Sequence, residues 1–72
     1  MRNTASNPTK SATLVVHHPV AGTSRTTYPT YAGAERAAQR ARLNPFVVAV
    51  AFRPDRAAAA LAFFNHLVMT EA

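Results

Sequence analysis

The sequence contains no cysteine, no tryptophan and only three acidic residues. Without cysteine, the chain forms no disulfide bond and no zinc site with thiolate ligands. The absence of cysteine also fits a reducing compartment, so we expect a cytoplasmic protein. No motif in the sequence calls for a bound cofactor, and none is expected.

The scarcity of acidic residues limits the chemistry that the chain can perform. Glu35, Asp55 and Glu71 are far apart in the sequence, and none lies at metal-ligand spacing from a histidine. His17 and His18 are adjacent, so on a strand they point to opposite faces and do not readily bind one metal ion. The sequence has no glycine-rich phosphate loop, nucleophile elbow or zinc-protease motif. It therefore predicts no metal site, no catalytic residues and no enzyme activity.

Long apolar stretches are also absent. The longest uncharged stretch, residues 57–70, is shorter than the roughly 20 apolar residues that span a bilayer. The first dozen residues contain no apolar run of the kind found in secretory signals. They are mainly polar, and such segments do not bury enough apolar surface to offset the entropy of ordering. We therefore expect a flexible arm over residues 1–12, one compact domain over residues 13–72 and no membrane partner.

Basic residues, in contrast, are abundant. Eight lysines and arginines oppose the three acids and give a formal net charge of +5 and a pI near 11.3. Such a balance favours anionic partners, either nucleic acid or an acidic protein surface.

The centre of the predicted fold is the apolar run FVVAVAF at residues 46–52. It follows Pro45 and is closed by Pro54, and it is rich in β-branched and aromatic residues, which predicts a buried strand. Alternation places its large side chains on one face and its smaller ones on the other. The large set is Phe46, Val48, Val50 and Phe52, and the small set is Val47, Ala49 and Ala51. We expect helices on the large face and only light cover on the small one.

The other elements follow from short patterns. Residues 13–18 and 25–28 are β-prone and flank a loop that contains Gly22, which predicts a hairpin. Alanines recur at helical spacing after Thr30, a favourable N-cap, and predict a helix that ends before Pro45. A second helix is predicted from Asp55 to about residue 69. Its expected buried face consists of Ala57, Ala60, Leu61, Phe64 and Val68.

Together these elements predict a two-layer α+β domain with the order β-β-α-β-α. Its sheet has three antiparallel strands in the order 2-1-3, and both helices lie on one face. A parallel pairing of strand 3 with strand 2 is the alternative topology.

The second predicted helix is apolar on nearly every side, with no charge between Arg56 and Glu71. A helix of this kind is normally buried, but a three-stranded sheet covers only one of its sides. We therefore predict that Phe63, Leu67 and Met69 contact another chain, in the simplest case a second copy in a homodimer.

The first predicted helix has the opposite character, with alanines on one side and polar side chains on the other. We predict that a polar partner is bound by Arg36, Gln39, Arg40 and Arg42, together with Arg25 of the hairpin. Because Tyr28 and Tyr31 lie nearby, direct contact with single-stranded nucleic acid is the alternative.

The hairpin over residues 13–28, the helix AERAAQRA at 34–41 and the strand at 46–52 resemble small inhibitors encoded by phages and other mobile elements, such as anti-CRISPR proteins. The resemblance concerns the layout of residues 13–69. It implies a non-enzymatic protein that binds a host protein or nucleoprotein complex and blocks it by occlusion. A small basic nucleic-acid-binding regulator is the alternative function.

Overall fold

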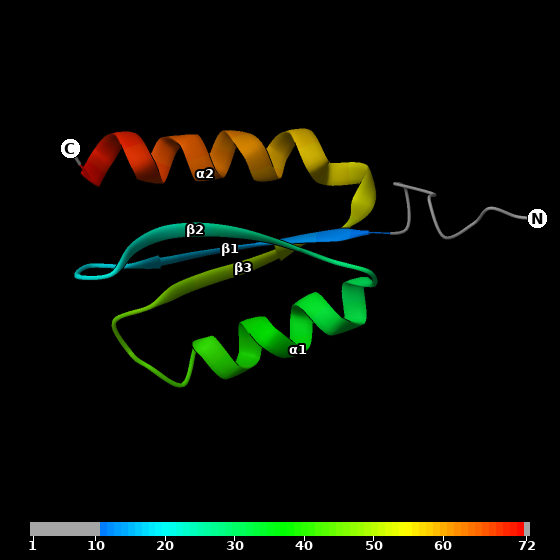
Figure 1. Cartoon of the computed structure of the whole chain (residues 1–72), viewed down its shortest axis with the longest axis horizontal. Helices are drawn as coiled ribbons and strands as arrows, with labels where there is room; N and C mark the ends of the chain where they lie inside the picture. The colour runs from blue at the N-terminus through cyan, green and yellow to red at the C-terminus, as the bar shows by residue number, and fades with distance from the viewer. Residues whose placement is uncertain (1–10, 72) are drawn as a thin grey trace, which may run out of the picture.

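The computed structural model describes residues 11–71. Along the chain it contains β1 (Ala12–His18), β2 (Gly22–Tyr28), α1 (Tyr31–Ala41), β3 (Val48–Phe52), the short 3-10 helix η3 (Pro54–Arg56) and α2 (Ala57–Glu71) (Figure 1). Most of the predicted flexible arm, residues 1–10, lies outside the described residues. Ala12 begins β1 and is buried.

The sheet has the strand order β2-β1-β3, and both outer strands run antiparallel to β1. The predicted α+β class, the element order and the 2-1-3 sheet are thereby confirmed, and the parallel alternative is excluded. Val15 lies in the middle of β1, between Arg25 of β2 and Val50 of β3, and its exposed fraction is 0%.

The β1–β2 connection is a tight turn that His18 stabilises. The His18 Nδ1 atom accepts the backbone N–H groups of Val20 and Ala21, each at 3.0 Å. Gly22 follows with φ of 96°, a left-handed conformation that side chains with a Cβ disfavour. The turn thus fixes the register of the hairpin.

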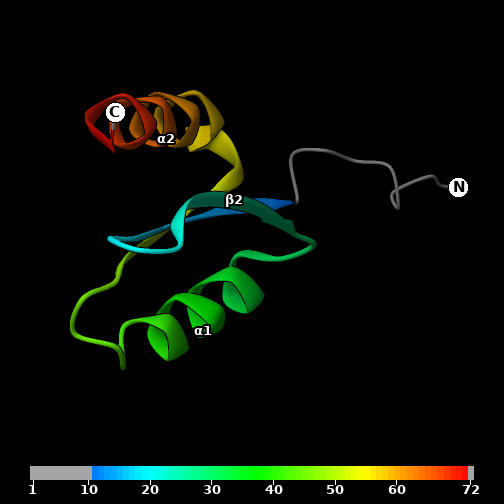
Figure 2. The same cartoon turned by 60° about the vertical axis from the view of Figure 1, so that its left-hand side comes forward.

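The two helices cover opposite faces of the sheet (Figures 1 and 2). Leu14 and Ala49 pack against Ala38 of α1 on one side. On the other side Phe52 packs against Phe63 of α2, with the ring centroids 5.8 Å apart. The prediction of two layers with both helices on one face is therefore wrong. Because β3 is apolar on both faces, each face needs its own cover.

Helix α1 lies close to the sheet because alanines meet at their interface. Ala34 and Ala38 are fully buried, and Ala38 packs against Ala49 on the small side of β3. Thr30 caps the helix as predicted, since its Oγ1 accepts the Gly33 N–H at 3.1 Å. The small face of β3 is thus covered by a helix, where only light cover was expected.

Strand β3 is shorter than the predicted strand at 46–52. The Val47 N–H donates to the Asn44 carbonyl oxygen, and the Phe46 N–H donates to Asn44 Oδ1, so these residues belong to a turn. Phe46 is 71% exposed and does not join the core. The prolyl residue and the asparagine side chain extend the turn into the apolar run.

Helix α2 is rotated relative to the prediction. Ala60 is fully buried, and Phe63, Phe64 and Leu67 are half-buried on the same side. Leu61 and Val68, which were expected in the core, are 45% and 40% exposed. The predicted buried face is therefore confirmed at Ala60 and Phe64 and wrong at Ala57, Leu61 and Val68. Over residues 11–71, no helix is long and apolar enough to cross a membrane.

Candidate partner-binding surfaces

The helices are offset from each other across the sheet. Helix α1 packs mainly on β1 and β3, whereas α2 packs mainly on β1 and β2. Consequently, β2 is little covered on the α1 side, and β3 is little covered on the α2 side. Val48, which shares a face with Val50 and Phe52, is 46% exposed for this reason.

The side chains on the flank of α1 toward β3 interact with other parts of the domain. Arg42 donates from Nε to the Ala49 carbonyl oxygen at 2.8 Å and forms a 3.4 Å ion pair with Glu35. The Tyr31 hydroxyl donates to the other Glu35 carboxylate oxygen at 3.2 Å. The guanidinium carbon of Arg53 lies 4.2 Å from the centroid of the Tyr31 ring. The arginines on this flank therefore have intramolecular partners.

The flank toward β2 is different. Arg36 and Arg40 are exposed, and among the described side chains no carboxylate pairs with either guanidinium. They line a shallow depression of about 250 Å³ together with Tyr28, Gly33 and Ala37. A Cβ atom at Gly33 would lie 3.3 Å from Thr30 Oγ1 and 3.9 Å from the Tyr28 ring. The absence of a side chain at Gly33 therefore leaves space in the depression beside Tyr28. The result is an open site with two unpaired cations, which suits an anionic ligand.

The structure brings together only part of the predicted polar set. Arg36 and Arg40 share the depression, and Gln39 is exposed on the same helix. Arg42 instead binds Glu35 and the Ala49 carbonyl oxygen within the domain. Arg25 lies on the other side of the sheet, with its guanidinium carbon 5.0 Å from the centroid of the Phe64 ring. These five residues do not form one surface.

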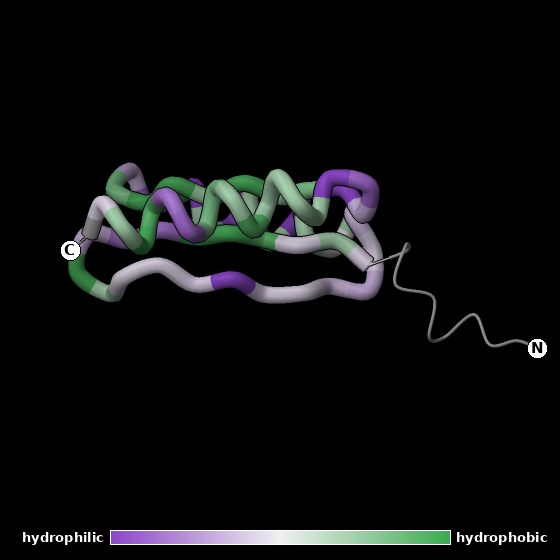
Figure 3. The backbone as a smooth tube through the Cα atoms, turned by 90° about the horizontal axis from the view of Figure 1, so that it is seen from above, coloured by the Kyte–Doolittle hydropathy of each residue, from purple (hydrophilic) through white to green (hydrophobic). Residues whose placement is uncertain are grey.

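The second candidate surface is the exposed apolar part of α2. Leu61, Val68 and Met69 are its large exposed apolar residues, and we call this set the α2 outer face. Of the predicted apolar contact residues, Met69 is 77% exposed, whereas Phe63 and Leu67 are half-buried and Phe63 contacts Phe52. Leu61 and Val68 were missed because they were assigned to the core. Figure 3 shows the apolar colouring along much of α2 and the paler β2 beside it.

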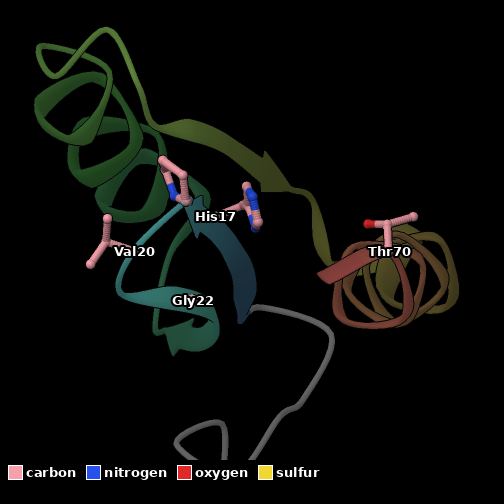
Figure 4. A pocket seen from close by; sticks show the side chains of 5 residues that line it. His17, Val20, Gly22 and Thr70 are labelled. Carbon is pink, nitrogen blue, oxygen red and sulfur yellow. The ribbon is translucent and has the colours of Figure 1, made fainter. Parts of the chain in front are cut away.

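A wider depression of about 470 Å³ lies where the hairpin turn meets the end of α2, and its lining includes His17 and Thr70 (Figure 4). A ring nitrogen of His17 lies 2.8 Å from Thr23 Oγ1, and the Thr70 hydroxyl donates to the Leu67 carbonyl oxygen. The polar groups here already interact within the chain. Within the described part of the chain, no group of three potential ligands could hold a metal ion.

No protein-family model, curated protein or solved structure matches the chain. The resemblance to phage-encoded inhibitors thus stays a prediction, and function has to be inferred from the residues.

Proposed function

We propose that the protein is a non-enzymatic interaction protein that binds a host protein or nucleoprotein complex and inhibits it by occlusion. The observation that supports this function best is the contrast between the two flanks of α1. Arg42 and Arg53 have intramolecular partners, whereas Arg36 and Arg40 face solvent beside an open depression.

The unpaired arginines carry a small energetic cost. Two like charges one helical turn apart destabilise a helix by about 0.2–0.5 kcal/mol. An anionic partner removes this repulsion and gains charge-assisted hydrogen bonds from both guanidinium groups. Their arrangement is thus better suited to a complex than to the free domain.

The α2 outer face supports a second, apolar contact. Leu61, Val68 and Met69 are large apolar side chains left in water, and a small domain gains stability when such a face is covered. A second copy is the simplest partner, as a homodimer through α2. Because α1 and α2 lie on opposite faces of the sheet, this dimer keeps the two cationic α1 surfaces apart.

Affinity capture from a host-cell lysate, with and without nuclease, tests the main proposal. The wild-type chain should retain a partner in stoichiometric amount, and the double variant Arg36→Glu, Arg40→Glu should lose it. Arg56→Glu is the control, because it reverses an exposed charge at the start of the α2 segment, away from the depression. Unchanged capture by the double variant would refute the role of α1.

A small basic nucleic-acid-binding regulator is the second candidate. The observation in its favour is that Tyr28 lies beside both unpaired arginines in the depression. This function predicts binding to nucleic acid without any host protein, with an affinity that falls steeply as salt is added.

A further inference from the structure

A row of hydroxyl groups on β2 lies on the same side of the sheet as the unpaired arginines of α1. Ser24, Thr26 and Tyr28 of β2 are paired in register with Val16, Leu14 and Ala12 of β1. Leu14 and Val16 pack on the α1 side of the sheet, so the three hydroxyl residues lie on that side too. Because α1 is offset toward β3, Ser24 and Thr26 remain exposed.

We propose that this surface binds the phosphodiester backbone of a nucleic-acid strand. We call it the α1–β2 surface and define it by Ser24, Thr26, Tyr28, Arg36 and Arg40. One phosphate lies in the depression between Arg36 and Arg40, and the hydroxyls of β2 contact the adjoining backbone. This inference rests on the proposed function, because it names the part of a nucleoprotein target that the cationic surface contacts.

The electrostatics of the surface suit an anion. Glu35, the acid nearest in sequence, is held on the other flank of α1 by Arg42 and Tyr31. No described carboxylate lines the depression. Its volume of about 250 Å³ is several times the about 30 Å³ that one water molecule occupies, so a hydrated anionic group fits.

The distribution of apolar residues favours nucleic acid over a protein at this surface. The fully buried core of a protein–protein interface is rich in apolar side chains. The large exposed apolar residues lie in the hairpin turn, the α1–β3 loop, β3 and α2, and they are Val20, Leu43, Phe46, Val48, Leu61, Val68 and Met69. None is on the α1–β2 surface. Arginine, serine, threonine and tyrosine side chains are the groups that contact phosphates and sugars.

The position of Tyr28 indicates backbone contact without base recognition. Its ring is half-buried and packs against the cluster of Leu14, Ala38 and Ala49. Because the ring is used for packing, the arginine and hydroxyl groups around it supply the contacts, and contacts to phosphate and sugar carry no sequence information. Binding at this surface is therefore independent of base sequence.

Fluorescence anisotropy with a labelled single-stranded oligonucleotide at low salt tests the inference. Arg36→Gln and Arg40→Gln should each weaken binding about tenfold, the equivalent of one charge-assisted hydrogen bond of about 1.4 kcal/mol. Each should also lower the slope of log affinity against log salt by about 0.7–1. Arg56→Gln removes the same charge away from the surface and should change the affinity less than about twofold.

A threonine pair on one strand provides a finer control. Thr26 and Thr27 are adjacent and exposed in β2, but only Thr26 shares the α1 face, whereas Thr27 is paired with Thr13 on the other. Thr26→Val should weaken binding a few fold, because it removes one hydroxyl hydrogen bond to the backbone, and Thr27→Val should not. An oligonucleotide of different base sequence should bind with the same affinity. Circular dichroism of each variant verifies that the fold is intact.

Three outcomes would overturn the inference: no oligonucleotide binding at low salt, an equal loss in Arg56→Gln and Arg36→Gln, or displacement of the oligonucleotide by polyglutamate at the same charge concentration. The last outcome would assign the surface to an acidic protein. If capture of a host protein requires Arg36 and Arg40 but oligonucleotides do not bind, the proposed function survives and this inference fails. If oligonucleotides bind through both arginines and no host partner is captured, this inference survives and the proposed function fails.

Discussion

Arg42 closes part of the outer edge of the sheet by donating its Nε–H to the Ala49 carbonyl oxygen at 2.8 Å. Strand β3 is an edge strand, and unpaired edge groups are sites where other strands add. The same guanidinium reaches Glu35, which the Tyr31 hydroxyl also contacts. Arg42 thus connects α1 to β3 and differs in role from the other arginines of its helix.

Arg42→Ala should destabilise the domain by about 1–2 kcal/mol, because it removes a charge-assisted hydrogen bond to backbone. The half-exposed ion pair with Glu35 adds little to this value. Urea unfolding followed by circular dichroism measures the difference. Arg36→Ala is the matched control on the same helix, and its effect should stay within about 0.5 kcal/mol. Equal losses in both variants would contradict the structural role of Arg42.

Phe63→Ala should destabilise the domain by about 2–3 kcal/mol, since it removes the ring that packs against Phe52. Phe46→Ala deletes the same side chain from an exposed loop position and should cost less than about 0.5 kcal/mol. Thermal unfolding of the two variants measures the contrast. A larger loss in Phe46→Ala would show that the run at 46–52 is buried as a whole.

The proposed homodimer predicts a sedimentation mass of twice the 7.7 kDa chain at micromolar concentration. Met69→Glu places a charge on the α2 outer face and should return the protein to a monomer without loss of helix. Phe63→Glu is a poorer test of the dimer, because Phe63 packs against Phe52 and a charge there should also destabilise the domain. A monomeric wild type would rule out the dimer.

His18→Ala should destabilise the hairpin by about 1–2 kcal/mol, since Nδ1 accepts two backbone N–H groups in the β1–β2 turn. His66→Ala is the control, because His66 is exposed on α2. Hydrogen exchange of the hairpin amides, together with urea unfolding, locates the effect. Protection that is unchanged in His18→Ala would show that Gly22 alone sets the turn.

The sequence predicted the elements whose signals are local. Thr30 and the alanines that follow define α1, and the β-prone run of β1 and the continuous apolar run of β3 define these strands. The side on which α2 lies was not predictable, because both faces of β3 are apolar. The buried face of α2 was not predictable either, since Leu61 and Phe63 are equally apolar and only contact with Phe52 selects between them.

The candidate site could likewise be predicted only in part, because contacts between elements distant in the sequence decide which arginines remain unpaired. Arg36, Arg40 and Arg42 look equivalent along the helix, and they differ only because Arg42 reaches the edge of β3 and Glu35. Arg25 was grouped with them because the face of β2 on which it lies depends on the hairpin register. The proposed contribution of the Ser24 and Thr26 hydroxyls has no signal in the sequence, because short polar residues in a strand usually indicate only an exposed edge.

The placement of α1 and α2 on opposite faces of the sheet has a consequence for valency. In a dimer joined through the α2 outer faces, the two α1–β2 surfaces face away from each other, with two sheets and two helices between them. Such a dimer cannot place both surfaces on one short rigid segment of a partner. It bridges two separate segments instead, and the second attachment then benefits from the effective concentration that the first creates.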